Sequence, residues 1–224
     1  MKTYLTQVWD ISYKDIRLEM RTRQMAVSVL VIVIALMIVT NLAIPKSVDA
    51  TFTTTATVIW LCILIASFMV VMRNFVIEYD QIGFHGLIMC PVPRDAIYLG
   101  KVVSNLIFLL VIESILFPLS SILFDVPLLT PTVAAITGMA TIGIVAAGTL
   151  FAAISVNTKA REIMLPVLFF PAVIPIVLAA VDATQNALNP SYGANILEDI
   201  GVLAALSLAI IATSAILFNF AVDE

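Results

Sequence analysis

The chain has 224 residues, of which 62% are hydrophobic and only 12% are charged, and its mean hydropathy is +1.11. A soluble domain carries about a quarter charged residues, so this composition excludes a soluble globular protein and indicates an integral membrane protein. The formal net charge of −4 at pH 7 says little about partners, but the sequence has no basic patch that would bind nucleic acid.

The N-terminal segment, residues 1–24, has the pattern of an amphipathic helix. Its basic residues Lys14, Arg17 and Arg21 lie on one helical face, and its apolar residues recur on a different face: Leu5, Val8, Trp9, Tyr13, Ile16 and Met20. We expect an elbow helix that lies in the cytoplasmic headgroup layer of the bilayer. The alternative is a polybasic segment that only fixes the topology.

Long apolar runs follow this segment. The first begins near Met25, after a charged stretch, so it reads as a retained transmembrane helix rather than a cleaved signal peptide. Each run can cross the bilayer as a helix with its backbone groups bonded internally. The sequence therefore predicts an all-α membrane protein with a six-helix domain over 25–224, whose spans are 25–44, 54–72, 103–124, 131–155, 163–181 and 201–222.

The Lys and Arg residues predict the orientation of these spans. Lys46 alone lies in an odd-numbered loop, while the rest of the eleven lie in the N-terminal segment and the even-numbered loops. Because cytoplasmic loops carry the excess of Lys and Arg, we expect both termini to be cytoplasmic. The fifth loop, about 182–199, has neither Lys nor Arg and is expected outside.

Intramembrane polar residues are candidates for function because they are costly in hydrocarbon. Glu113 lies in the middle of the third span and could line a substrate path or be a neutral or hydrogen-bonded packing residue. The fourth span carries small residues at close-packing spacing, Gly143 with Ala147 and Gly148 with Ala152. We interpret them as packing within the chain rather than as a dimer contact.

The motifs of common enzymes are missing. The sequence has no phosphate-binding loop, no HExxH pair and no GxSxG turn, so we expect a subunit that is not an enzyme. Cys62 and Cys90 lie far apart and are interpreted as free thiols. With His85 as its single histidine, the chain is not expected to build a metal site of its own.

The second cytoplasmic region, about 76–101, contains the segment YDQIGFHGLIMCPVPRDAIYLGK, with apolar Leu87, Ile88 and Met89 among charged residues. Apolar residues exposed in a loop usually mark a docking surface. A short helix between Gly86 and Pro91 could insert these side chains into a groove of a partner. The alternative is that the segment lies along the membrane surface.

Three blocks of the sequence resemble the haem exporter protein B family, the CcmB-type ABC transporter permeases of cytochrome c maturation. They are KDIRLEMRTRQ (14–24), FVIEYDQIGFHGLIMCPVPRDAIYLGKVVSNLIFLL (75–110) and ISVNTKAREIMLPVLFFPAVIPIVLAAV (154–181). The stretch QIGFHG (81–86) departs from the family's more acidic, Leu-rich version. His85 is not typical of the family and is expected to be a docking or solvated residue rather than a haem ligand.

The resemblance implies an ABC-2-type permease fold in the bacterial inner membrane, with a coupling region that docks a separate ATPase. The docking residues it points to are Glu78, Tyr79, Asp80, Gly86, Leu87, Ile88, Met89, Pro91 and Arg94. It implies partners of the CcmA type (the ATPase), the CcmC and CcmD types (membrane subunits) and the CcmE type (the haem chaperone), with two copies of this chain. ATP would bind the partner, and haem would be handled by the complex, with no cofactor on this chain.

Two other functions stay open at this point. The chain could be a membrane scaffold that passes force to a haem-handling neighbour without a substrate path of its own. It could also be a generic ABC-2 exporter of a drug, lipid or glycan.

Overall fold

A computed structural model describes residues 4–22, 24–43, 48–80, 93–156, 161–189 and 196–221. Within these ranges it contains seven helices and no strands: α1 (Tyr4–Thr22), α2 (Gln24–Ala43), α3 (Val48–Asp80), α5 (Arg94–Phe124), α6 (Pro131–Val156), α7 (Arg161–Leu188) and α8 (Ile196–Ala221). Six of the helices, α2 to α8, are long and apolar enough to cross a membrane. This confirms the predicted all-α membrane fold. The seventh helix, α1, lies within the N-terminal segment 1–24 that was expected to be an amphipathic helix.

Several helices extend beyond the spans that hydropathy predicts. α3 begins before residue 54 and continues past residue 72 to Asp80, and α5 begins at Arg94 rather than at 103. α7 continues to Leu188 and α8 begins at Ile196, so helix takes up both flanks of the predicted external loop 182–199. The predicted region 76–101 is likewise helical at both of its ends. Hydropathy detects the part of a helix that is apolar, whereas helical hydrogen bonding continues into the polar flanks.

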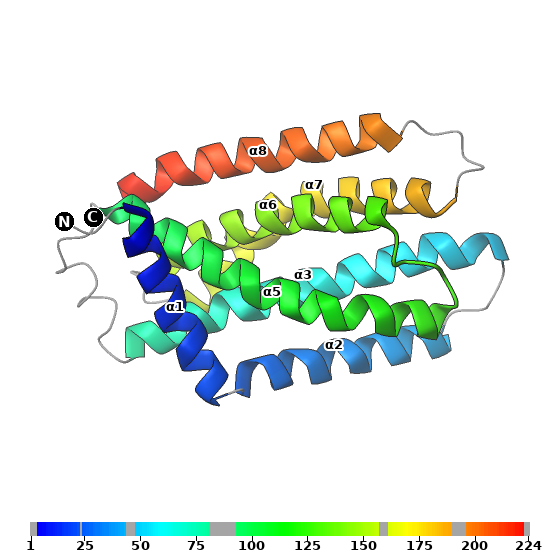
Figure 1. Ribbon diagram of the computed structural model, residues 1–224, viewed down its shortest axis with the longest axis horizontal. Helices are drawn as coiled ribbons and strands as arrows, with labels where there is room; N and C mark the ends of the chain where they lie inside the picture. Colours follow the sequence, from blue (N-terminus) through cyan, green and yellow to red (C-terminus); the bar gives the residue numbers. More distant parts are fainter. Residues whose placement is uncertain are drawn as a thin grey trace.

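The helices form a bundle in which α3 and α6 lie inside and α2 and α8 lie at opposite edges (Figure 1). In the most apolar stretch of α6, 72% of the residues are buried, against 17% in the corresponding stretches of α2 and of α8. α6 packs against α8, α7, α3 and α5. The outer helices expose large apolar side chains, such as Leu42, Ile122 and Leu208. These surfaces suit a lipid environment, because hydrocarbon is as apolar as the side chains themselves.

Small residues on α6 allow the central helices to approach closely. A Cβ atom on Gly143 would lie 2.8 Å from the Ser207 hydroxyl oxygen of α8, and one on Gly148 would lie 2.9 Å from Val71 of α3. Both contacts are closer than ordinary van der Waals packing allows, so a side chain would push the helices apart. The small residues of the fourth span therefore pack within this chain, as predicted.

Hydrogen bonds between polar side chains join the central helices. Trp60 of α3 donates its ring N–H to Thr184 of α7 over 2.9 Å, and Asn105 of α5 donates to Thr149 of α6 over 3.2 Å. All of these side chains are buried. Such bonds satisfy polar groups that the bilayer cannot hydrate, and they fix the positions of the helices along one another.

Helix α1 lies across one end of the bundle (Figure 1). The start of α1, the start of α5 and the end of α8 lie at this same end, while the 125–130 connection between α5 and α6 lies at the other. In the described helices, most of the Lys and Arg residues belong to α1 or to the helix ends on this side of the bundle. That this end of the bundle, with α1, is cytoplasmic stays a prediction from the distribution of Lys and Arg.

Candidate functional site

The residues predicted to dock an ATPase lie in and beside the connection between α3 and α5. Glu78, Tyr79 and Asp80 form the last turn of α3, and Arg94 is the first residue of α5, directly after Pro93. Five of the predicted residues and His85 fall outside the described residues: Gly86, Leu87, Ile88, Met89 and Pro91. The structure therefore describes the two helices that frame the predicted docking segment.

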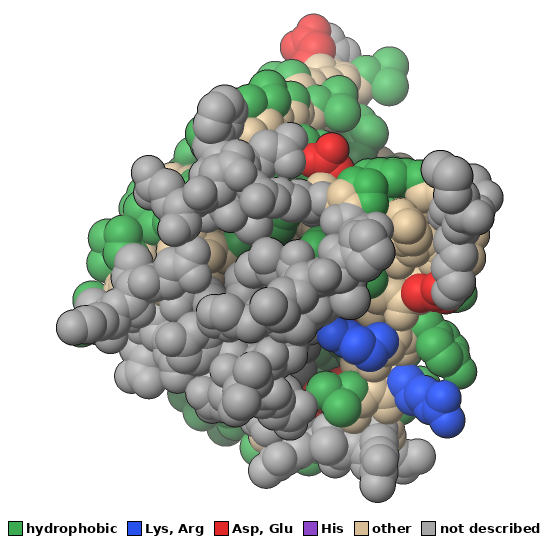
Figure 2. Space-filling view, turned by 90° about the vertical axis from the view of Figure 1, so that its left-hand side faces the viewer, with side chains coloured by type: hydrophobic (Ala, Val, Ile, Leu, Met, Phe, Trp, Pro, Cys, Tyr) green, Lys and Arg blue, Asp and Glu red, His purple; other side chains and the backbone are tan. Residues whose placement is uncertain are grey.

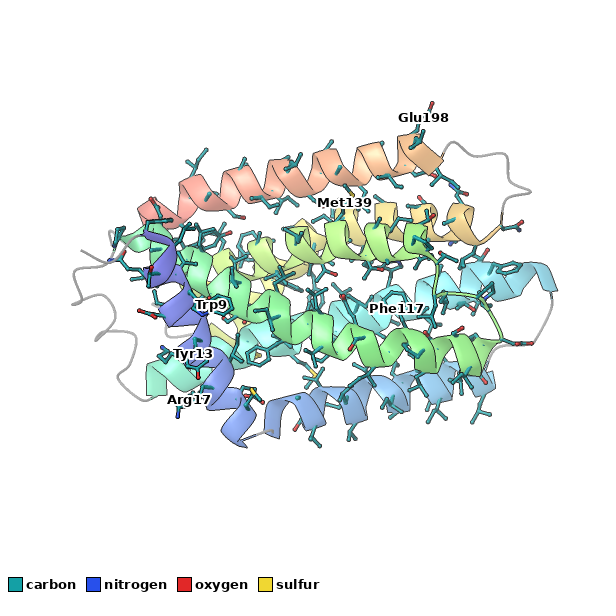
Figure 3. The ribbon with its side chains drawn as sticks, viewed as in Figure 1. Trp9, Tyr13, Arg17, Phe117, Met139 and Glu198 are labelled. Carbon is teal, nitrogen blue, oxygen red and sulfur yellow. The ribbon has the colours of Figure 1, made fainter. Side chains whose placement is uncertain are left out.

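The outer surface of α1 is both apolar and basic. Trp9 and Tyr13 are more than half exposed, at 57% and 53%, and Leu5 and Met20 are more exposed still. Trp9, Tyr13 and Arg17 follow one another along the helix (Figure 3). Seen from the α1 end of the bundle, hydrophobic and basic side chains reach the surface close together (Figure 2). An exposed aromatic and apolar face beside a basic one is typical of a helix in the headgroup layer.

The inner surface of α1 is polar and packs against the start of α5. The Ser12 hydroxyl donates to the backbone carbonyl of Gly100 over 2.8 Å. A Cβ atom on Gly100 would lie 2.8 Å from Cγ2 of Ile11, so glycine at this position lets the two helices touch. The contact therefore depends on one small residue in α5 and a hydroxyl group in α1.

A buried ion pair completes this contact. The Lys101 Nζ lies 3.9 Å from Oδ2 of Asp15, and their side chains are 2% and 8% exposed. The Ser104 hydroxyl donates to the same Asp15 oxygen over 3.4 Å. Lys14, with a side chain 48% exposed, lies 3.2 Å from the other carboxylate oxygen. Buried charges require partners of this kind, and here the partners come from two helices.

We name this contact, made by Ile11, Ser12 and Asp15 of α1 with Gly100, Lys101 and Ser104 of α5, the α1–α5 clamp. α1 is also linked to the next helix, because the Glu19 carboxylate accepts a hydrogen bond from the backbone N–H of Ala26 over 3.2 Å. The clamp was not predicted from the sequence. One sequence pattern could have predicted it. Besides its apolar and basic faces, α1 has a third face on which Ser12, Asp15 and Glu19 recur at helical spacing.

Glu113 lies at a cavity between α5 and α6. Its side chain is 3% exposed, and its Oε1 accepts a hydrogen bond of 2.7 Å from the Thr141 hydroxyl. Its Oε2 has no hydrogen-bond partner among the described residues. The cavity has a volume of about 590 Å³ and lies between the spans α5 and α6 and the 125–130 connection. Glu113 is thus buried, bonded through one of its two oxygens, and part of the lining of a cavity. Its two expected roles, in packing or along a substrate path, stay predictions.

Metal ligands are not clustered in the part of the chain that the structure describes. Within those ranges no three His, Cys, Asp or Glu residues come close enough to hold an ion. Cys62 is a buried free thiol in α3, and Cys90 lies outside the described residues.

Comparison with known proteins agrees with the fold. No match to the chain is found among curated proteins. A family model described as CcmB protein matches residues 6–224, which includes α1 and all six candidate spans. The chain therefore belongs to the CcmB family and is a multi-pass membrane component, of the permease type, in the system for haem export and cytochrome c maturation.

Proposed function

We propose that this chain couples ATP hydrolysis by a separate CcmA-type ATPase to export of haem or release of a haem-loaded CcmE-type chaperone. The α1–α5 clamp is the observation that supports coupling most directly. α5 begins directly after the predicted docking segment, and its second and third turns are joined to α1 through Gly100, Lys101 and Ser104. A displacement of the docking segment would then move α5 and α1 together.

The proposed assembly lies in the bacterial inner membrane and contains CcmC- and CcmD-type membrane subunits and two copies of this chain. ATP binds the ATPase, and haem is cargo of the complex. Membership of the CcmB family favours this function over a generic exporter of a drug, lipid or glycan. This chain contributes helices that move, and no catalytic residue.

The docking segment provides the central test. Leu87→Asp or Ile88→Asp places a charge where an apolar side chain is expected to fill a groove of the ATPase, and buried interface anchors carry most of the binding energy. We expect each variant to insert normally but to lose the ATPase and cytochrome c maturation. The measurement is recovery of the ATPase with the tagged chain from membranes, beside the membrane level of the chain. Arg94→Ala, expected at the rim of the docking surface, is the control and should reduce recovery of the ATPase less than the acidic variants do. Normal recovery of the ATPase with both acidic variants would mean that the segment lies on the lipid surface.

The orientation is tested by labelling. In a chain whose Cys62 and Cys90 are replaced, Ser191→Cys should react with an impermeant thiol reagent added from outside, because the fifth loop has no basic residues to retain it inside. Thr158→Cys is the matched position in the fourth loop and should be protected. Protection at residue 191 together with labelling at residue 158 would reverse the topology.

A further inference from the structure

The cavity beside Glu113, which we name the α5–α6 cavity, is open to the outside of the bundle. Its rim includes the exposed side chains of Leu110 and Leu129 and the exposed residues Pro131 and Ala134. Glu113 lies 11 residues before the end of α5 at Phe124, which is roughly 17 Å along the helix axis. The cavity therefore extends from the 125–130 connection into the membrane-spanning part of the bundle.

The polar groups around Glu113 present hydrogen-bond acceptors to this cavity. The Ser114 hydroxyl donates to the carbonyl of Val111 over 2.7 Å, and the Thr137 hydroxyl donates to the carbonyl of Val133 over 2.8 Å. With their hydrogens used in this way, both oxygens are left as acceptors. The Oε2 of Glu113 adds a third acceptor, which has no partner among the residues that the structure describes.

Pro118 adds to this excess of acceptors. It lies inside α5 and lines the cavity together with Ser114. Because proline has no N–H, the carbonyl of Ser114 does not receive the helical hydrogen bond that residue 118 would otherwise donate. Ser114 is exposed at the outside of the bundle, so this carbonyl can be reached by a ligand that donates hydrogen bonds.

We propose that the α5–α6 cavity binds an amphipathic primary amine, with its ammonium group at Glu113 and its apolar body along Leu110, Phe117 and Leu128. The lining is mostly apolar with a few convergent polar groups, and its volume of about 590 Å³ is in the range of small-molecule sites. A ligand with an ammonium group offers three hydrogen-bond donors to the acceptor oxygens of Glu113 and Ser114, whereas a ligand with a hydroxyl group offers only one. The Thr141 bond holds the carboxylate in place for this contact.

The amine could come from a membrane lipid with an ethanolamine headgroup or from a free lipophilic amine. Both share the ammonium group and an apolar body, so the site itself does not separate them. The proposal does not depend on the ATPase, because the cavity is formed by this chain alone.

Binding of radiolabelled dodecylamine to the full chain tests the proposal. The chain is placed in nanodiscs of phosphatidylcholine, whose headgroup is zwitterionic and whose quaternary ammonium group has no N–H. Empty nanodiscs give the background. We expect one saturable component. Unlabelled dodecylamine should compete fully, whereas dodecanol, which lacks the charge, and dodecyltrimethylammonium, which lacks the N–H groups, should compete weakly.

Two variants locate the site. Glu113→Gln keeps the shape of the side chain but removes the charge, and should weaken binding roughly tenfold or more, as expected for the loss of one charge-assisted hydrogen bond. Leu129→Trp places a large ring at the rim, where Leu129 is 69% exposed, and should also weaken binding while leaving Glu113 intact. Leu197→Trp makes the same change on α8, at a side chain 85% exposed that does not line the cavity, and should bind as the unmodified chain does.

Equal binding by the unmodified chain, Glu113→Gln and Leu129→Trp would overturn the proposal, as would a lack of saturable binding. If Leu129→Cys instead cross-links to another membrane subunit and no amine binds, the cavity is a docking surface for a partner helix and the proposal is wrong. Nanodiscs that contain phosphatidylethanolamine separate the sources. A fall in dodecylamine binding there assigns the site to the lipid, and unchanged binding assigns it to a free amine.

Discussion

Replacing Lys101 by methionine is expected to lower the free energy of unfolding by about 3 kcal/mol, because it leaves Asp15 buried without its cationic partner from α5. The expected loss is at the low end for a broken buried ion pair, since Lys14 still lies 3.2 Å from the carboxylate. α1 should also separate from the bundle more readily. Unfolding in mixed detergent micelles measures the first effect, and the rate of tryptic cleavage at Arg17 measures the second.

Lys14 provides a matched control for this experiment. Lys14→Met removes a lysine from the same carboxylate, but this lysine is 48% exposed, so the expected cost is below about 1 kcal/mol. The double variant Asp15→Leu with Lys101→Met should regain much of the stability, because an apolar pair can replace a buried ion pair. Equal losses for Lys14→Met and Lys101→Met would show that burial does not decide the strength of the clamp.

Glu113→Lys is expected to have the largest effect within the membrane-spanning part. The new ammonium group would lie beside the Thr141 hydroxyl, where a carboxylate now accepts a hydrogen bond. Without that carboxylate the nearby oxygens are all neutral, and neutral oxygens do not compensate a buried charge. We expect the level of the chain in membranes to fall several-fold and cytochrome c maturation to fail. Immunoblots of membranes and haem staining of cytochromes c measure the two effects.

Glu113→Gln is the companion variant, since it keeps the shape and an acceptor oxygen for Thr141. It should assemble normally. Normal assembly and cytochrome c maturation with Glu113→Lys would contradict the buried position of the side chain and place it at the lipid edge or in water.

The sequence predicted the spans well because burial in lipid is a property of single segments. Any run of about 20 apolar residues can be recognised without knowledge of its neighbours. The helix ends were predicted less well. α3 continues to Asp80 and α5 begins at Arg94, both in polar sequence, because helical hydrogen bonds do not stop at the edge of the apolar region.

Contacts between segments could be predicted only in part. The exposed apolar face of α1, with Trp9 and Tyr13, follows from spacing alone. The clamp does not, because Ser12 and Asp15 meet Gly100 and Ser104 across 88 and 89 residues of chain, and no local pattern pairs them. The small residues of α6 could be interpreted correctly because close approach needs only a missing side chain, whatever the partner.

The α5–α6 cavity could not be predicted from the sequence either, because it depends on contacts between segments. Hydropathy marks Glu113 as unusual in its span. The residues around its Oε2, which has no hydrogen-bond partner among those described, come from two helices and a connection. Thr137 and Thr141 belong to α6, and Leu128 and Leu129 precede it. A cavity is a property of how these segments pack, which a single segment does not encode.

The long sequence separation within the clamp has a consequence for synthesis of the chain. Asp15 is made 86 residues before Lys101, which at typical elongation rates is roughly 4–17 seconds. During that time the acidic face of α1 has no α5 to pack against, so α1 can rest at the membrane surface only by its apolar and basic faces. Insertion of the third span then brings Lys101 to the Asp15 carboxylate. As a result, α1 becomes fixed to the bundle only after half of the membrane domain has been inserted.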